Sequence, residues 1–235
     1  MIDRAAKRIL DATLAAAGLV TAGPFLAAIG AAVKLDTPGP ALFHHPRLGR
    51  GGRPIVVTKF RTMRVAAEQA FNPDGSRREV RAGDTRVTSV GRFLRGGLDE
   101  LPQLVGVLLG ELSLVGPRPD DLYAVDLYRE GEWLKLSVKP GLTGLAAVSG
   151  RNDLPWRERL LYDIYYAHHR NIWLDLRIIA KTAALALGIA GPGGVVTRDE
   201  AASFAGSAEA VQAGRLIEAA VRAQLGTAPP SSPQP

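Results

Sequence analysis

The chain has no cysteine among its 235 residues. Disulfide bonds and thiolate metal sites are therefore excluded, and nothing in the composition points to an oxidising compartment. We also find no internal repeat, which argues against a solenoid or propeller. Hydrophobic residues make up 46% of the sequence, so the chain is long and apolar enough to bury the core of one or two domains.

Acidic residues are scarce between His44 and Arg95, where twelve Lys and Arg stand against four Asp and Glu. This basic block favours a polyanionic partner, which is an anionic lipid surface, a nucleotide diphosphate or a nucleic acid. Few aromatic residues interleave with these charges, and no nucleic-acid-binding motif frames them. The sequence therefore indicates no nucleic-acid partner.

Charged side chains are absent from Ala12 to Val33, a run that would form a helix about 33 Å long, enough to cross a bilayer core. Gly23-Pro24 interrupts the run near its centre, where proline bends a helix. Basic residues flank both ends: Arg4, Lys7 and Arg8 before it, and Lys34 after it. Because the charge asymmetry of a spanning helix is missing, we predict a re-entrant helix-break-helix. A kinked transmembrane helix and a cleaved signal peptide are the alternatives.

The strongest chemical signal lies between Leu98 and Pro119, with the sequence LDELPQLVGVLLGELSLVGPRP. A proline at 102 suits the first turn of a helix, so we predict a helix over 99–109 with Asp99 at or near its N-cap. A helix start can hold a phosphate beside a metal-bound carboxylate. Arg118 lies between two prolines, so a stiff backbone presents its guanidinium to phosphate oxygens. The structural alternative is a capping Asp beside a solvated Glu.

These segments, LDELPQL at 98–104 and SLVGPRP at 113–119, resemble the bacterial sugar transferases, which are monotopic polyprenol-phosphate phosphoglycosyl transferases. Further segments match in order along the chain: KRILD at 7–11, KLDTPGPALF at 34–43, RLG at 47–49, KFRTM at 59–63, DTRVTSVGRFLR at 84–95, KPGLTGL at 139–145, SGRND at 149–153 and YDIYYAHHRNIWLDLRIIAKT at 162–182. The resemblance covers residues 4–188, and so many ordered matches argue against coincidence.

The hydrophobic patterning predicts a mainly α fold with short β elements, an α+β class. We expect a strand over 54–60, one or two long helices over 156–187, and a further helix over 208–225.

The resemblance implies a domain order. Residues 1–34 would form the re-entrant membrane anchor, residues 35–190 a catalytic domain on the cytoplasmic face of the bacterial inner membrane, and residues 191–235 an accessory helix and a disordered tail. The residues expected to mark the anchor are Lys7, Arg8, Gly23 and Pro24.

The resemblance also implies an activity: transfer of a phospho-sugar from a UDP-sugar to a polyprenol (undecaprenyl) phosphate, with release of UMP. Asp99 would act as the nucleophile of a ping-pong reaction, and Glu100 as a base or a metal-orienting group. Mg²⁺ would be held by Asp99, Glu100 or both, together with substrate phosphate. A non-catalytic membrane-anchored scaffold and a soluble nucleotide-sugar hydrolase are the alternatives.

Several further residues are candidates for contact with the phosphates or the nucleotide: Arg118, Lys59, Arg61, Arg95, Arg151, Asp163 and Asp175. Each arginine has an alternative role in a headgroup contact or surface ion pair, and each of the two aspartates has an alternative role in holding helices together. The expected partners are the UDP-sugar, the polyprenol phosphate, anionic membrane lipids and a second copy in a homodimer. Two histidine doublets, at 44–45 and 168–169, are expected to have a structural or surface role.

The chain departs from the family pattern at Gly96-Gly97, at Val105-Gly106 and at Ala147. The two glycines before the acidic pair predict a looser loop there, because glycine is conformationally permissive. The Asp-Glu pair itself is intact.

Overall fold

The computed structural model describes residues 4–65, 83–150 and 153–225, and helices dominate it. The α-helices are α1 (Arg4–Asp36), α2 (Ser89–Leu94), α3 (Leu104–Leu109), α4 (Leu145–Ser149), α5 (Trp156–His169), α6 (Ile172–Ala186), α7 (Arg198–Ala205) and α8 (Ala208–Leu225). The strands are β1 (Leu42–Leu48), β2 (Pro54–Phe60), β3 (Ser113–Val115) and β4 (Gly141–Thr143). The 3₁₀ helices are η1 (Arg50–Gly52), η2 (Leu98–Gln103), η3 (Leu122–Asp126) and η4 (Glu130–Ser137). The mainly helical class with short strands is confirmed.

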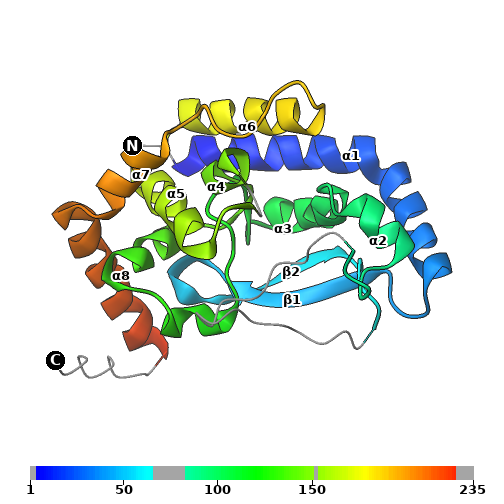
Figure 1. The fold of residues 1–235 in the computed structure, drawn as a ribbon, viewed down its shortest axis with the longest axis horizontal. Coiled ribbons are helices and arrows are strands. Elements are labelled where there is room, and N and C mark those ends of the chain that lie inside the picture. Colours follow the sequence, from blue (N-terminus) through cyan, green and yellow to red (C-terminus); the bar gives the residue numbers. More distant parts are fainter. Residues whose placement is uncertain (1–3, 66–82, 151–152, 226–235) are drawn as a thin grey trace.

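Helix α1 is continuous over 33 residues with Pro24 inside it, and it bends along its course (Figure 1). The predicted break at Gly23-Pro24 is therefore a bend within one helix rather than an interruption. The physical reason is that a proline removes one backbone hydrogen bond, while the turns on either side keep theirs.

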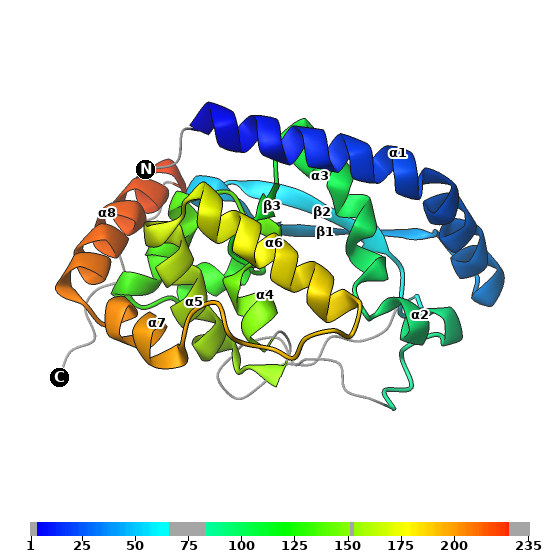
Figure 2. The ribbon, with the colours of Figure 1, turned by 90° about the horizontal axis from the view of Figure 1, so that it is seen from above.

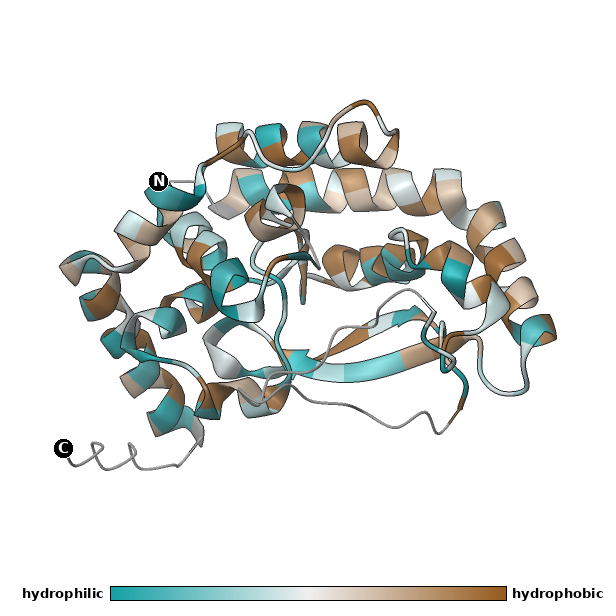
Figure 3. Ribbon diagram, viewed as in Figure 1, coloured by the Kyte–Doolittle hydropathy of each residue, from teal (hydrophilic) through white to brown (hydrophobic). Residues whose placement is uncertain are grey.

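Much of the surface of α1 is apolar and exposed. The helix is long and apolar enough to cross a membrane by length and composition, and hydrophobic colours run along most of it (Figure 3). Val20 is 79% exposed, Ile9 66% and Phe25 48%. Apolar area left in water costs roughly 25 cal/mol per Å², so this helix favours association with a membrane.

The predicted strand over 54–60 is confirmed as β2, which pairs antiparallel with β1. Its residues alternate, as expected for a sheet with one covered face. Ile55 and Val57 pack in a hydrophobic cluster with Ala15 of α1 and Val107 of α3. Lys59, two residues further on, therefore lies on this same inward face.

The segment predicted as one helix over 99–109 is two elements. The 3₁₀ helix η2 begins after Gly97, which is its N-cap and has φ +123°, and it runs into α3 at Leu104. Asp99 is thus the second residue of η2, two positions after the N-cap, which agrees with the prediction that it lies at or near the N-cap. Glycine is needed at 97, because an L side chain rarely adopts that φ.

The loop after β3 packs closely against the segment that contains the parallel strand β4. This close approach requires glycine at 116, 141 and 144, because a side chain at any of these positions would clash with backbone atoms. A Cβ on Gly116 would lie 2.5 Å from the Lys139 carbonyl oxygen, and one on Gly144 would lie 2.1 Å from the Gly116 carbonyl oxygen. The Gly141 N–H donates to the Pro117 carbonyl at 2.9 Å. The backbone that leads to Arg118 is thereby fixed against β4.

The long helical region over 156–187 is confirmed as two helices, α5 and α6, separated at Arg170 and Asn171. Asn171 caps α6, since its side chain accepts a hydrogen bond from the Leu174 N–H at 2.9 Å. The starts of α1 and α6 lie close together and the helices diverge from there (Figure 2). The helix over 208–225 is confirmed as α8, whereas α7 was not predicted.

Candidate active site

Opposite charges from four separate segments meet around Asp99. Asp99 and Glu100 come from η2, and Lys59 comes from β2, which lies against η2. Arg118 follows β3, and Arg95 is the C-cap of α2. The sequence predicts the acidic pair and indicates these three cations as phosphate contacts. The structure brings all five residues together.

Asp99 is largely buried, with 7% of its surface exposed. Burial raises the pKa of its carboxyl group, and the neighbouring Glu100 raises it further, while Lys59 and Arg95 oppose the shift. Two adjacent carboxylates that are poorly solvated repel each other, and a nearby positive charge stabilises their ionised forms. The site therefore favours a cation or a cation-rich complex beside these carboxylates.

Arg118 lies next to the second carboxylate, with 3.5 Å between its Nη1 and Oε1 of Glu100. Its side chain remains 41% exposed, so solvent and solutes can reach the guanidinium. Its backbone, in contrast, is fixed on both sides. The N–H donates to Asp163 at 3.4 Å, and the carbonyl accepts a hydrogen bond from Lys135 Nζ at 3.0 Å.

Lys59 provides a positive charge inside the site. Burial lowers the pKa of its ammonium group, the carboxylate of Asp99 raises it, and Arg118 lowers it again. Each of these groups therefore lies close enough to act on Lys59 electrostatically. A strand holds this lysine, so its position is more rigid than a loop would allow.

Arg61 does not belong to this site, which corrects one of the expected phosphate contacts. It is 5% exposed, and its guanidinium donates to backbone carbonyls at the end of α1. The acceptors include Thr37 at 2.7 Å, Pro38 at 3.0 Å and Pro40 at 2.7 Å. Arginine satisfies several carbonyls at once because it has five donors, so Arg61 closes the turn after α1.

The expected contacts of Asp163 and Asp175 with substrate are also corrected. Both carboxylates are buried, at 1% and 0% exposure. Asp163 pairs with Lys135 at 2.9 Å, and Asp175 pairs with Lys7 at 2.8 Å. Since neither is open to a solute, both hold elements together, which was the alternative role.

The cations that flank the anchor bind the start of α1 to the rest of the molecule. Lys7 contacts Asp11 and Asp175. Arg8 donates to the Val107 carbonyl at 2.6 Å, at the C-terminal end of α3. Arg151, the remaining candidate for phosphate contact, lies outside the described residues.

Lys135 is a supporting residue that sequence reasoning missed. It is 3% exposed and lies between Asp120 at 2.6 Å and Asp163 at 2.9 Å, while it also donates to the Arg118 carbonyl. Tyr128 and Trp156 complete the hydrogen bonds of Asp120. The available signal was a single lysine within the apolar stretch WLKL, where a charge needs a buried partner.

The histidine doublets have structural or surface positions, as expected, with His45 buried and His44 and His168 exposed. His45 contacts Asp121 at 2.9 Å, and His44 contacts the hydroxyl of Thr58 at 2.9 Å. His168 contacts Glu209 at 3.1 Å.

The donor set at Asp99 suits a divalent cation that substrate phosphate completes. Among residues 4–65, 83–150 and 153–225, no group of three or more His, Asp or Glu side chains is placed to hold a metal ion alone. Two adjacent carboxylates are present, and Mg²⁺ is often bound by one or two carboxylates together with phosphate oxygens. The residues therefore fit Mg²⁺ delivered with a phosphate substrate.

Known proteins match this chain over most of its length. The family model for bacterial sugar transferases matches residues 2–188. The chain is 40% identical over 190 residues to the UDP-glucose:undecaprenyl-phosphate glucose-1-phosphate transferase of Escherichia coli (strain K12), which covers 77% of this chain and 40% of that protein. It is 42% identical over 189 residues to the protein of the same name from Caulobacter vibrioides, which covers 75% and 67%.

A third relative is the exopolysaccharide production protein ExoY of Rhizobium meliloti, 38% identical over 189 residues that cover 75% of this chain and 83% of that protein. The chain spans about two fifths of the length of several relatives, the Escherichia coli protein among them. A family model that matches 2–188 and relatives near 40% identity agree with the motifs. This chain therefore belongs to the bacterial sugar transferase family.

Proposed function

We propose that this protein transfers a sugar phosphate from a UDP-sugar to undecaprenyl phosphate or a similar polyprenol phosphate, as an early membrane step of exopolysaccharide, O-antigen or glycoprotein glycan assembly. The observation that carries the proposal is the buried Asp99 beside Glu100, with Lys59 and Arg118 around the pair. The names of the relatives support glucose or galactose as the first sugars to test.

The reaction proceeds in two displacements. A carboxylate oxygen of Asp99 attacks the phosphorus next to the sugar, the bond to the UMP phosphate breaks, and UMP leaves with the electron pair. An oxygen of the polyprenol phosphate then attacks the same phosphorus and releases Asp99 as a carboxylate. Each step brings anions together, so Lys59, Arg95 and Arg118 reduce the repulsion that opposes attack.

Mg²⁺ would be held by Asp99, Glu100 or both, and when bound it supplies charge neutralisation to the diphosphate. The charge of Glu100 repels that of Asp99, so a cation between them would stabilise both carboxylates. We place the active site on the cytoplasmic side of the inner membrane, where nucleotide-sugars are available, with α1 re-entering the leaflet from which it starts.

The test measures UMP release by detergent-held protein with Mg²⁺, undecaprenyl phosphate and a panel that begins with UDP-glucose and UDP-galactose. We expect lipid-dependent release that Asp99→Asn abolishes, while the matched control Asp199→Asn on α7 keeps the wild-type rate. Release without the lipid acceptor at the full rate would indicate a hydrolase. Folded, membrane-bound protein that releases no UMP with any sugar would favour a scaffold.

The ping-pong mechanism has its own readout. Without acceptor, one equivalent of UMP should appear in a burst, and the protein should gain the mass of a sugar phosphate on Asp99. A burst that survives Asp99→Asn would contradict the assignment of the nucleophile.

A further inference from the structure

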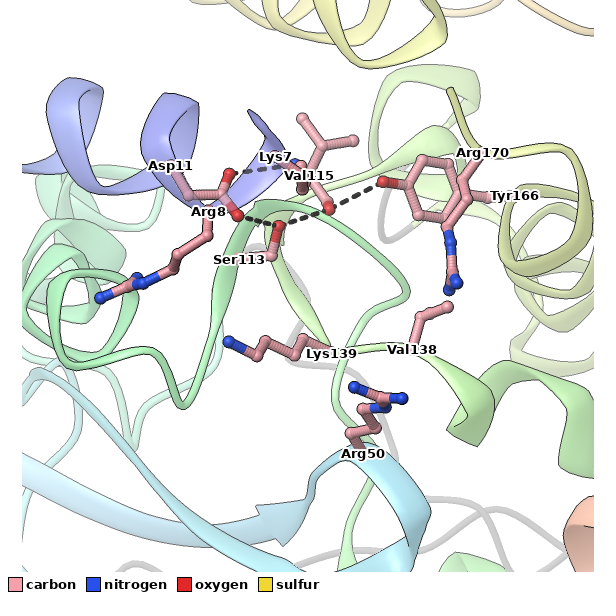
Figure 4. Close-up of a pocket in the computed structure, with 10 residues that line it drawn as sticks. All are labelled: Lys7, Arg8, Asp11, Arg50, Ser113, Val115, Val138, Lys139, Tyr166 and Arg170. Atoms are coloured by element: carbon pink, nitrogen blue, oxygen red, sulfur yellow. Dashed lines mark hydrogen bonds and ion pairs between the residues drawn. The ribbon is translucent and has the colours of Figure 1, made fainter. Parts of the chain in front are cut away.

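A second, strongly cationic pocket lies at the start of α1, away from the acidic pair. Its volume is about 170 Å³, and it lies between α1, η1, β3 and the segment before β4. Six charged side chains line it (Figure 4). They are Lys7, Arg8, Arg50, Lys139 and Arg170, with Asp11 as the carboxylate.

Two of these cations already have anionic or carbonyl partners. Lys7 lies 3.0 Å from Asp11 and 2.8 Å from Asp175. Arg8 donates to the carbonyls of Val107 and Leu108. The positive charge that the pocket offers to a ligand therefore comes mainly from its other side.

Arg50 and Lys139 supply that charge, and their side chains lie next to each other in Figure 4. Within the described part of the chain, neither forms an ion pair. Burial lowers the pKa of the Lys139 ammonium, and the nearby Arg8 lowers it further. A Cβ on Gly110 would lie 3.4 Å from Arg8 and 3.5 Å from Lys139 Nζ, so these cations crowd one small space. Asp11 is the one carboxylate among the described residues that line the pocket, and it acts in the opposite direction on the pKa of Lys139.

Exposed apolar side chains lie close in sequence to residues that line or contact the pocket. Ile9 follows Arg8 and is 66% exposed, and Leu109 precedes Gly110 and is 71% exposed. Trp173, at the start of α6 beyond Arg170, is 78% exposed. The pocket also lies at the start of α1, the helix that is apolar enough to enter a membrane. A cationic hollow at that position suits a lipid whose headgroup lies in the hollow and whose chains lie outside it.

The pocket is separate from the candidate active site. Arg8 contacts the last turn of α3, whereas Asp99 lies at the other end of the η2–α3 segment. The residues around Asp99, which are Lys59, Arg95, Glu100 and Arg118, do not line the pocket. The pocket therefore has its own set of cations.

We propose that this pocket binds the phosphate of an anionic membrane phospholipid, with Arg50 and Lys139 as its main contacts and Ile9 and Leu109 beside the acyl chains. This site fastens the start of α1 to the headgroup layer, and it does not depend on the proposed transferase activity.

The test titrates the full-length protein in detergent with short-chain phosphatidylglycerol by calorimetry. Arg50→Gln combined with Lys139→Gln should weaken binding at least tenfold. A control pair, Arg53→Gln with Arg92→Gln, removes the same charge from exposed sites outside the pocket and should change the affinity less than twofold. Arg50→Lys with Lys139→Arg keeps both charges and should retain binding, which separates lost recognition from lost folding.

Two further ligands identify the source of the phosphate. Inorganic phosphate and short-chain phosphatidylcholine should each bind at least tenfold more weakly than phosphatidylglycerol. Inorganic phosphate that binds as tightly would overturn the lipid assignment, and wild-type affinity in the glutamine pair would overturn the site. UMP release in detergent should be unchanged in that pair, so failure here is distinguishable from failure of the proposed reaction.

Discussion

At the scale of single residues, the charge of Lys59 opposes the protonation of Asp99. Burial and Glu100 raise the pKa of Asp99 above its usual 3.8, and Lys59 acts against this shift. Attack requires the carboxylate, so activity is present above that pKa and is lost as the pH falls through it.

Lys59→Met should therefore move the acidic limb of the kcat/KM profile for UMP release to higher pH. The rate at its optimum should fall about 100-fold, as for loss of one charge-stabilising group. Lys59→Arg keeps the positive charge and should keep the limb in place. An acidic limb that stays fixed in Lys59→Met would mean that another group sets it.

Lys135 stabilises the structure beneath Arg118. Burial acts to raise the pKa of the Asp120 carboxyl group. Lys135 lowers it, and the pKa lies below its ordinary value. Lys135→Met would leave two buried carboxylates without a cation, so the free energy of unfolding should fall by about 3–5 kcal/mol. Denaturant titration measures this loss, and adding Asp120→Asn and Asp163→Asn should recover part of it. A loss below about 1 kcal/mol would show that the carboxylates find other partners.

The sequence grouped the residues around Asp99 better than it identified their supports. The structure brings Asp99, Glu100, Lys59 and Arg118 together, and their roles toward a substrate stay predictions. Arg61 looked equally suited to phosphate. Its real acceptors are carbonyls more than twenty residues earlier in the chain, and no local pattern reveals such a contact.

At the scale of elements, the start of α1 docks on α6 through one buried ion pair. Lys7 and Asp175 have side chains that are 16% and 0% exposed, and Tyr166 donates to the same carboxylate at 2.7 Å. Burial raises the pKa of Asp175, while Lys7 lowers it. The pair therefore stabilises the contact only while both members are present.

A double-mutant cycle measures this coupling. Lys7→Met alone should lower the free energy of unfolding by about 3–5 kcal/mol, because it strands a buried charge. Combined with Asp175→Asn, the loss should be smaller than the sum, with a coupling of about 1–3 kcal/mol. The exposed pair Arg198–Glu158 is the control, and its coupling should be below 1 kcal/mol. Equal coupling in the two pairs would contradict a special role for Lys7.

Element types were predictable where periodicity was strong, and boundaries were not. The strand at 54–60 and the helices at 156–187 and 208–225 follow from regular apolar spacing. The helix at 99–109 is instead two elements, η2 and α3, which meet at Leu104, and Pro102 lies inside η2. Helix α7 lies in a segment where glycine and polar residues obscure the pattern.

At the scale of the whole molecule, the path of α1 decides how the protein meets the bilayer. The chain has no cysteine, so one introduced thiol reports one position. In the re-entrant arrangement, Ala5→Cys and Leu35→Cys should both react with an impermeant maleimide in inside-out vesicles. Neither should react in sealed spheroplasts. Ser203→Cys on α7 is the control for the cytoplasmic side. Labelling of the two ends from opposite sides would show that α1 spans the membrane.

The hydrogen bonds from Arg61 to the turn after α1 affect where the proposed reaction takes place relative to the membrane. Arg61 follows strand β2 and donates to carbonyls just after α1, and Lys59 lies two residues earlier on that strand. We therefore expect Lys59 to keep its position relative to the end of α1. How deeply α1 sits in lipid therefore sets the height of Lys59 above the headgroups. One residue inserted into α1 would displace that end by about 1.5 Å and rotate it by about 100°. The thickness of the bilayer and the length of α1 therefore decide whether the phosphate of a lipid substrate reaches the height of Asp99.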